Sequence, residues 1–419
     1  MSGPEMSPNL ALDQLVARRT AAGASIVHLG FGESRLPVLP ELVGRLVQGA
    51  SRNGYGPVAG SLAVRDAIAG YFTRRQVPTD ADQIVVGPGS KPLLLALQLV
   101  VPGDVVLPKP SWVTYAPQVR MAGKTPLGAP IPAECGGVPD PDALRETIRV
   151  ARANGANPRI VVLTLPDNPT GTVPPPHLVR EVCAVAENED LLVISDEIYR
   201  DLVHDPATPV LGPAEVIPHR TVVLTGLSKN LALGGWRVGA ARFPANADGE
   251  RIRDGVTSVA SDVWSTLAGP MQAVAEYAFA EPPEVVARIA ADARLHGTVA
   301  RAVHEIVTSA GALCRPPAAA FYVYPDFEPA REPLARIGVT DGASLQRYLL
   351  EDLGIAVLSG HHFGDDADAL RFRAATSVLY GTNHDDQRAT QLAEDPLRLP
   401  HIAEALAEVE RAFQKLASV

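Results

Sequence analysis

The segment Thr225-Gly226-Leu227-Ser228-Lys229-Asn230-Leu231-Ala232-Leu233-Gly234-Gly235-Trp236-Arg237-Val238-Gly239 joins two apolar runs, 222–224 and 238–242. Runs of this length and composition predict buried strands. The loop between them is bracketed by glycines and carries a lysine eight residues before an arginine. A surface Lys and Arg pair is the simplest alternative. Only five of the 37 basic residues are lysines, however, so a lysine placed directly after a buried strand indicates a functional group.

Outward from this loop, short apolar runs alternate with helical segments. The predicted strands are 84–86, 105–107, 160–163, 191–194, 222–224 and 238–242, and helices are expected at 92–101, 176–187 and 251–260. Strands that are apolar throughout are typical of a sheet buried on both faces. The sequence therefore predicts an α/β fold with a mainly parallel sheet between two layers of helices.

The two ends of the chain indicate a second, smaller α+β domain. A helix is predicted at 9–22 and another at 402–417, with strands at 320–324, 355–358 and 369–373 before the last helix. We expect residues 1–50 to form the N-terminal segment of the small domain, 51–305 the large domain and 306–419 the rest of the small domain. The polar segment 381–399 is interpreted as either a lid or a solvated loop, with the loop favoured.

Composition excludes several classes of protein. The 419 residues are 46% hydrophobic and 20% charged, which is enough apolar material for a large core. The formal net charge of −10 argues against nucleic-acid binding, and no stretch is long and apolar enough to suggest membrane insertion. The three cysteines lie far apart without a CxxC pair, which argues against disulfides and structural zinc and favours the cytoplasm. No metal site is expected.

Four segments fall at the carboxyl ends of predicted strands, the edge at which open α/β sheets bind ligands. One is the loop of Lys229, and another is Gly87-Pro88-Gly89-Ser90-Lys91, which opens a helix. Free backbone N–H groups and the helix dipole at this point suit a phosphate, although a glycine turn capped by Ser90 is the simpler interpretation.

The other two segments place an amide and a carboxylate at the same edge. Leu165-Pro166-Asp167-Asn168-Pro169-Thr170-Gly171 presents Asn168, and Ile194-Ser195-Asp196-Glu197-Ile198-Tyr199 presents Asp196 just past an apolar strand. The first segment could be an ordinary Asx turn and Asp196 a helix cap. A carboxylate beside a buried strand is costly unless it meets a cation, so Asp196 is also a candidate partner for a positively charged ligand.

Taken together, the motifs resemble those of one family. The run 226–239 is similar to the lysine signature of the class I/II aminotransferases, the fold type I pyridoxal 5′-phosphate (PLP) enzymes related to aspartate aminotransferase. The resemblance extends over nearly the whole chain through the order and spacing of Tyr55, Gly89, Trp112, Asn168, Asp196, Tyr199, Lys229, Arg237 and Arg371. It implies a seven-stranded sheet in the large domain and a homodimer.

The resemblance assigns a cofactor role to most of these residues. It implies that Lys229 carries the PLP aldehyde and moves the substrate Cα proton, and that Asp196 keeps the pyridine nitrogen protonated. Asn168 and Tyr199 would bind the phenolic oxygen, and Trp112 would stack on the ring. The phosphate would be held by Gly89, Ser90, Lys91, Ser228 and Arg237, with Tyr55 contributed across the dimer interface.

For the substrate, the resemblance implies that Arg371 grips the α-carboxylate, with Gly32 and Asn168 beside it. The sequence departs from the family pattern at Arg35 and at Arg373, which adds a second cation near the carboxylate-binding strand. No arginine appears around 261–264 to read a distal carboxylate, so specificity for aspartate or glutamate is not expected.

The function implied is transfer of an amino group from an α-amino acid to a 2-oxo acid, by a ping-pong route through pyridoxamine phosphate. Two alternatives stay open. One is elimination, replacement or oxidation of an amino acid on the same fold, because the residues that hold PLP do not distinguish these reactions. The other is a ligand-sensing module that has lost turnover, although such modules usually carry a DNA-binding domain ahead of the fold.

Overall fold

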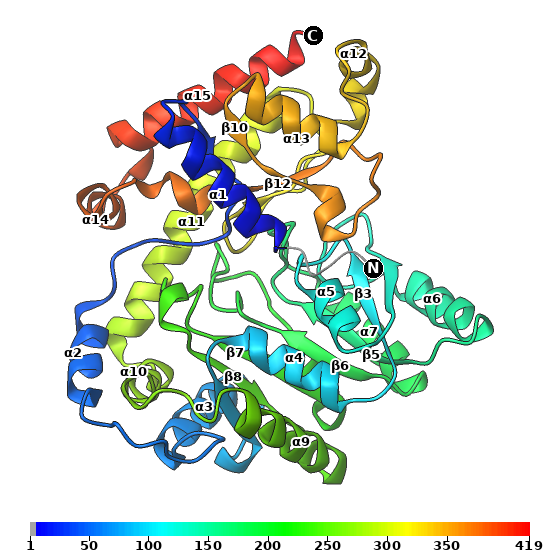
Figure 1. Ribbon diagram of the computed structural model, residues 1–419, viewed down its shortest axis with the longest axis vertical. Helices are drawn as coiled ribbons and strands as arrows, with labels where there is room; N and C mark the ends of the chain where they lie inside the picture. The colour runs from blue at the N-terminus through cyan, green and yellow to red at the C-terminus, as the bar shows by residue number, and fades with distance from the viewer. Residues whose placement is uncertain (1–5) are drawn as a thin grey trace.

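A seven-stranded sheet forms the centre of the larger domain in the computed structural model, which describes residues 6–419 (Figure 1). Its strands are β2 (Ile84–Gly87), β3 (Asp104–Lys109), β4 (Pro126–Pro130), β5 (Pro158–Thr164), β6 (Leu192–Asp196), β7 (Thr221–Gly226) and β8 (Gly239–Arg242). They lie in the order β2-β8-β7-β6-β5-β3-β4, and only β8 runs antiparallel to its neighbours. The expected mainly parallel α/β sheet is therefore confirmed.

Helices cover both faces of this sheet because its strands carry apolar side chains on both sides. Ile160 and Val162 of β5 face one helical layer, and Val161 and Leu163 face the other. The first layer consists of α4 (Ser90–Val100), α5 (Tyr115–Met121) and α9 (Ala247–Val263). The second consists of α3 (Leu62–Arg74), α6 (Pro141–Ala153), α7 (Pro176–Asn188), α8 (Pro213–Val216) and α10 (Gly269–Ala280).

Segments from both ends of the chain build the smaller domain, at the top of Figure 1. Its elements are α1 (Pro8–Ala21), β1 (Val27–His28), β9 (Tyr322–Val323), α12 (Arg331–Arg336), α13 (Gly342–Glu351), β10 (Ile355–Ala356), β11 (Leu358–Ser359), β12 (Phe372–Ala375), α14 (His384–Leu392) and α15 (Pro400–Ala417). β1 pairs with β10, and β11, β12 and β9 form a small antiparallel sheet. Stacked rings of Phe327, Phe372 and Phe413 lie in its core. The expected α+β domain is confirmed.

Two helices bear on the expected domain boundaries, which stay predictions. α2 (Pro40–Gly49) packs against the large domain, where Leu42 shares a cluster of buried side chains with Val274 of α10. α11 (Pro283–Ser309) is a single helix that crosses residue 305 and extends along both domains (Figure 1). Proline in the first turn of α2 and α11 suits these helix starts, because that turn has no intrahelical use for the missing N–H.

The polar segment 381–399 is not the solvated loop that the sequence favoured. It contains α14, whose first turn is capped by Asn383, the side-chain oxygen of which accepts from the Asp386 N–H at 2.9 Å. The Thr390 hydroxyl, which is buried, donates to the Tyr380 carbonyl at 3.1 Å. These local bonds hold the segment as a helix against α11, away from the active-site cavity described below.

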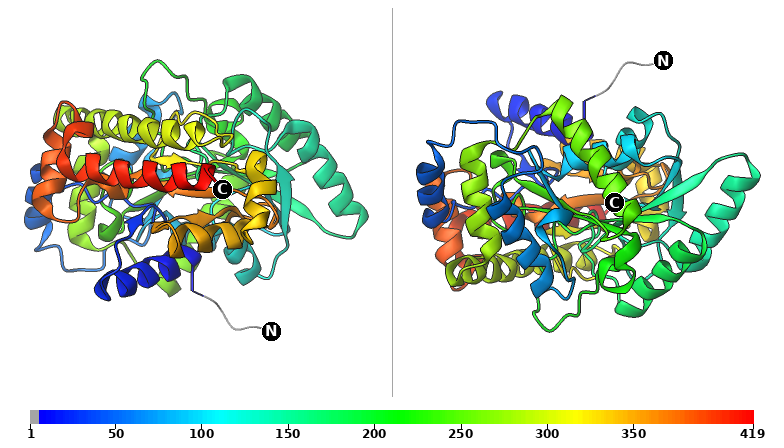
Figure 2. Two further views of the ribbon diagram at one scale, coloured as in Figure 1. Left: turned by 90° about the horizontal axis from the view of Figure 1, so that it is seen from above. Right: turned by 90° about the horizontal axis from the view of Figure 1, so that it is seen from below.

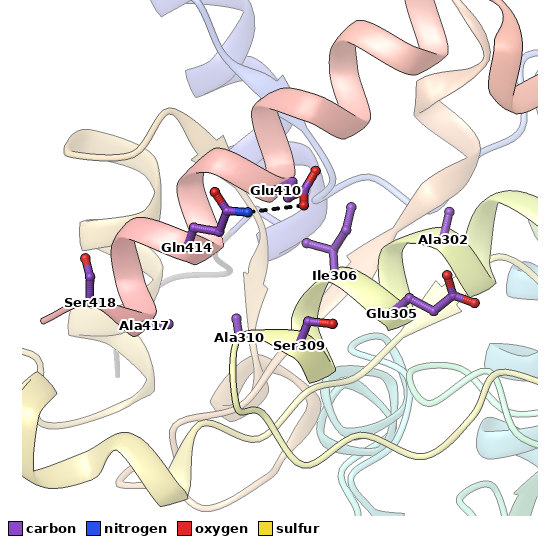
Figure 3. Close-up of a pocket in the computed structure, with 9 residues that line it drawn as sticks. All are labelled: Ala302, Glu305, Ile306, Ser309, Ala310, Glu410, Gln414, Ala417 and Ser418. Atoms are coloured by element: carbon purple, nitrogen blue, oxygen red, sulfur yellow. Dashed lines mark hydrogen bonds between the residues drawn. The ribbon is translucent and has the colours of Figure 1, made fainter.

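α11 and α15 run side by side when the molecule is seen from above (Figure 2). Between their carboxyl-terminal halves lies an open hollow of about 600 Å³, shown in Figure 3. Its lining includes Glu305 and Glu410, and Glu410 accepts a hydrogen bond from Gln414 at 3.1 Å. The four strand-end segments identified in the sequence do not line this hollow. None of the helices within residues 6–419 is long and apolar enough to cross a membrane.

Candidate active site

A cavity of about 440 Å³ lies where the carboxyl ends of β5, β6 and β7 meet the small domain. The large domain contributes most of its lining, and α1, β9, β12 and the loop after β1 contribute the rest. Of the predicted site residues, the lining contains Gly32, Ser90, Lys91, Trp112, Asn168, Asp196, Tyr199, Ser228, Lys229 and Arg237. Because parallel strands end at the same edge of the sheet, segments that are far apart in sequence meet in one cavity.

Lys229 lies in the loop after β7 and points into this cavity. Its Nζ donates to the Gly32 carbonyl at 2.7 Å. Burial lowers the pKa of the Lys229 ammonium to about 8; nearby Glu33 opposes this shift, and Arg373 adds to it. A lysine with a pKa near neutrality releases its proton readily and can then act as a nucleophile or as a base.

Asp196 ends β6 and is 4% exposed. Its Oδ2 accepts from the Tyr115 hydroxyl at 2.8 Å, and the same hydroxyl lies 3.0 Å from the Thr164 Oγ1. Burial raises the pKa of the Asp196 carboxyl to about 6, although the Tyr115 bond opposes that shift. A positive charge brought opposite Asp196 would stabilise the ionised form.

An anion cradle lies at the other end of the cavity, where β2 leads into α4. Gly89 has φ +89°, and a Cβ at this position would lie 2.2 Å from Nη2 of Arg237. The positive φ favours glycine at the start of α4, and the missing Cβ leaves room for the Arg237 guanidinium. The backbone of Arg237 is in the left-handed region, with φ 58°, and its Nη1 donates to the Gly234 carbonyl at 2.8 Å. Ser90 and Ser228 complete a site suited to a phosphate.

The middle of the cavity carries aromatic and amide groups. Trp112 lines it, with its ring edge-on to that of Tyr115 at a centroid distance of 5.3 Å. The Tyr199 hydroxyl lies 2.6 Å from the Tyr322 hydroxyl, and both side chains are buried. Asn168 uses its Oδ1 to accept from Arg373 at 3.0 Å. These groups can bind a flat ring and its oxygen substituent.

Arg373 is the cation that the structure places against Asn168. Its guanidinium, 1% exposed, donates to the Gly30 carbonyl at 2.9 Å and to Asn9 at 3.4 Å. Among the residues that the structure describes, its hydrogen bonds go to amide and carbonyl oxygens rather than to a carboxylate, and its Nε has no hydrogen-bond partner. A buried guanidinium without a counter-charge is costly, so this position is suited to an anionic ligand.

Arg371, which the sequence suggested for this position, lies elsewhere. Its Nε donates to Asp326 at 2.7 Å and its Nη1 to Asp365 at 3.1 Å, and it does not line the cavity. Arg371 precedes β12, whereas Arg373 lies inside it, opposite Leu358. The assignment of Arg371 to the cavity is therefore corrected to Arg373, because strand register brings the second arginine of the pair over the cavity.

Two further predicted residues lie outside the lining. Gly89 lies directly behind it, in contact with Arg237. Tyr55 is 80% exposed and does not reach the cavity of its own chain. Sequence reasoning missed Tyr115 and Tyr322, which hydrogen-bond to Asp196 and Tyr199. Tyr115 is the first residue of α5, and its N–H donates to the Trp112 carbonyl at 3.0 Å, so a tight turn brings the two rings together.

Comparison with known proteins gives a consistent result. A family model described as aminotransferase class I and II matches residues 24–379. An aspartate aminotransferase from Pinus pinaster is 31% identical over 387 residues, covering 89% of this chain and 76% of that protein. One from Bacillus sp. (strain YM-2) is 29% identical over 384 residues, covering 89% of this chain and 93% of that protein.

The fold agrees as well. The solved structure of aspartate aminotransferase from Thermus thermophilus with maleate superposes with a TM-score of 0.80 at 25% identity, covering 98% of this chain and all of that one. The family model spans most of the chain, and the structural match includes both domains. This protein therefore belongs to the class I and II aminotransferases.

Proposed function

We propose that this aminotransferase uses PLP to move the amino group of an α-amino acid to a 2-oxo acid by a ping-pong mechanism. The observation that carries the proposal is the convergence of Lys229, Asp196 and Arg373 on one cavity. An amine of lowered pKa, a buried carboxylate and an unpaired buried guanidinium are the groups that PLP and an amino acid together require.

The residues of the cavity fit the cofactor. Asp196 is a carboxylate held in a dry site, where its ionised form needs a cation such as a protonated pyridine. The Gly89 cradle and Arg237 provide donors at the far end, at the place a phosphate would occupy. Trp112 contributes an aromatic ring to the lining. Tyr199 and Asn168 would hold the ring oxygen.

When bound, PLP supplies an electron-withdrawing ring that stabilises negative charge at the substrate Cα. The residues of this chain do the rest. The Lys229 amine would hold the cofactor aldehyde and, once displaced by the substrate amine, would take the proton from Cα and deliver it to the carbon that carried the aldehyde oxygen. Asp196 would keep a proton on the ring nitrogen by charge pairing, and the Tyr199 hydroxyl, which lies against that of Tyr322, would donate to the ring oxygen.

For the substrate, we propose that Arg373 binds the α-carboxylate. The guanidinium already donates to Asn168 and the Gly30 carbonyl, which hold it in place, and its unpaired Nε leaves a donor free. A carboxylate would supply the counter-charge that residues 6–419 do not. Charge-assisted bonds from a guanidinium fork are strong and directional, so the α-carboxylate would also orient Cα toward Lys229.

The side chain of the substrate is not set by a further cation of this cavity. Its lining holds Lys91, Lys229, Arg237 and Arg373, and each already serves the phosphate, the aldehyde or the α-carboxylate in this proposal. We therefore propose α-amino acids as the substrate class without a preference for acidic side chains, although several relatives are named for aspartate.

We propose a homodimer in which the partner copy supplies Tyr55 to the phosphate. The support is that the side chain of Tyr55, which lies between Gly54 and Gly56, is 80% exposed in the single chain. A tyrosine buried at an interface can donate to a phosphate at the edge of the cavity. Analytical ultracentrifugation would show a dimer, and a monomer with full activity would contradict this part of the proposal.

A single-turnover experiment tests the reaction. PLP-loaded protein is mixed with individual amino acids in the absence of any 2-oxo acid, and the products are measured. Transamination predicts that each site releases one 2-oxo acid and then stops until an acceptor is added. Continuous release of ammonia, with or without oxygen consumption, would instead indicate elimination or oxidation. Binding of amino acids without any product would favour a sensing module.

A further inference from the structure

The guanidinium of Arg373 lies against two aromatic rings of different origin. Its Cζ is 4.8 Å from the ring centroid of Tyr322 and 4.9 Å from that of Phe363. Tyr322 belongs to β9 and is fixed by the small sheet. Phe363 belongs to a short 3-10 turn, Gly360–Phe363, outside any sheet. The position of Phe363 therefore depends on its packing against buried neighbours such as Leu358 and on what holds that turn.

Arg371 forms hydrogen bonds at both ends of this turn. Its backbone carbonyl accepts from the Gly360 N–H at 2.8 Å, and its Nη1 donates to the Asp365 carboxylate at 3.1 Å. The Asp365 side chain is 4% exposed and also accepts from the Tyr324 hydroxyl at 2.9 Å. Among the described residues, Arg371 is the cation paired with this buried carboxylate.

The ion pair is asymmetric. The Arg371 side chain is 37% exposed and also donates to Asp326 at 2.7 Å, so its own charge stays partly hydrated. Asp365 has little contact with water, and loss of its partner would leave a buried carboxylate with only a tyrosine hydroxyl. Removing one member of such a pair is costly, and the turn can relieve the cost by opening toward water.

We propose that Arg371 is a positioning residue for the substrate α-carboxylate, acting through Asp365 and Phe363 to hold Arg373. This inference rests on the proposed function of Arg373. The two arginines are two residues apart and have different roles. Arg373 binds the carboxylate, and Arg371 keeps the Phe363 ring packed against the Arg373 guanidinium. The Phe363 carbonyl also accepts from the Ser111 N–H at 2.9 Å, beside Trp112, so the turn contacts both substrate and cofactor sides.

The test uses the PLP-loaded enzyme and measures KM for the amino acid, kcat and the Kd for PLP. Arg371→Met is expected to raise KM about tenfold, because an aromatic contact to a buried cation has about this worth, with kcat changed less than about threefold. Arg371→Lys should restore most of the affinity by neutralising Asp365. The control is Arg149→Met, because Arg149 forms an exposed ion pair with Glu146 on α6 and should leave KM unchanged.

A double-mutant cycle identifies the route. Phe363→Leu alone should raise KM by a similar factor, and Arg371→Met in the Phe363→Leu background should add less than about twofold if both act on Arg373 through one contact. Independent effects that multiply would overturn the proposal. If Arg371→Met does not fold, Arg371→Gln replaces it, because it also leaves Asp365 without a counter-charge; the same rise in KM and the same non-additivity with Phe363→Leu are expected.

The outcome separates this inference from the function on which it rests. Arg373→Met should raise KM for the amino acid and abolish its preference over the matching amine without a carboxylate. An unchanged KM in Arg371→Met alongside that result would overturn the positioning role and leave the function intact. An unchanged KM in Arg373→Met would overturn the function of Arg373 itself. Loss of the carboxylate preference in Arg371→Met would show direct binding instead.

Discussion

The large-domain side of the cavity and its small-domain side are built in different ways. On the large-domain side, Asn168, Asp196 and Lys229 lie at or just after the carboxyl end of a parallel strand, so the sheet brings them together. On the small-domain side, Asn9, Gly32, Tyr322 and Arg373 come from segments spread over most of the chain. The large-domain side, where we propose that PLP binds (the cofactor side), therefore depends on strand ends. The small-domain side, where we propose that the amino acid binds (the substrate side), depends on the register of short strands.

The largest effect should come from the cofactor side. We expect Lys229→Ala to lower kcat by about 10⁴-fold or more, because the aldehyde loses its attachment and Cα loses its base. Steady-state assays with added PLP measure this. The matched control is Lys415→Ala on α15, which should keep ordinary rates. Circular dichroism should show an intact fold, and a Lys229→Ala variant with ordinary turnover would contradict the assignment.

The substrate side should respond through binding. Arg373→Met is expected to weaken amino-acid binding by about 2 to 5 kcal/mol, since the buried guanidinium is the proposed anchor of the α-carboxylate. The measurement is the amino-acid dependence of the single-turnover rate, with the Kd for PLP determined in parallel. A loss of PLP binding that matches the loss of amino-acid binding would show that the two sides of the cavity are not separable in this way.

Asp196 allows a test by pH in the cofactor-free protein. Its pKa is raised to about 6 by burial, so the folded state binds more protons than the unfolded state between about pH 4 and pH 6, and this carboxylate destabilises the fold above that range. Asp196→Asn should therefore raise the free energy of unfolding at pH 7 by about 1 to 3 kcal/mol and change it little near pH 4. Urea unfolding at the two pH values measures this. Equal effects at both would exclude a titration origin, and activity should fall in either case.

The smallest effect concerns the partner copy. Tyr55→Phe is expected to raise the Kd for PLP about tenfold, because a hydrogen bond to a charged group is lost while the ring remains. Fluorescence titration with PLP measures the change. Tyr348→Phe, on α13 of the small domain, serves as the control. An unchanged Kd in Tyr55→Phe would exclude this tyrosine from the phosphate site.

The sequence predicted six of the seven strands of the large sheet and missed β4. That strand, Pro126–Pro130, contains two prolines and a glycine, so it lacks the β-branched composition that identifies the others. It lies at the edge of the sheet, where proline is tolerated because one side of the strand has no ladder to complete. Edge strands are therefore the part of this fold that local composition predicts least well.

Some residues of the site could likewise be predicted from local motifs, and others could not. Motifs at strand ends identified Asn168, Asp196, Lys229 and the Gly89 loop, because each combines an apolar strand with one polar group just beyond it. The choice between Arg371 and Arg373 could not be made in this way. Both arginines have the same parity along a short strand, and only the pairing of β12 with β11 and β9 decides which of them faces Asn168.

The order of apolar strands, helices and polar strand ends along the chain determined the α/β fold, the family and the cofactor side of the cavity, because parallel strands that share a sheet must end at one edge. The tertiary structure decided which arginine lines the cavity, that residues 384–392 form a helix and that Tyr322 contacts Tyr199. These features depend on contacts between segments separated by 100 residues or more, or on bonds to neighbouring elements. Local sequence patterns do not predict such contacts.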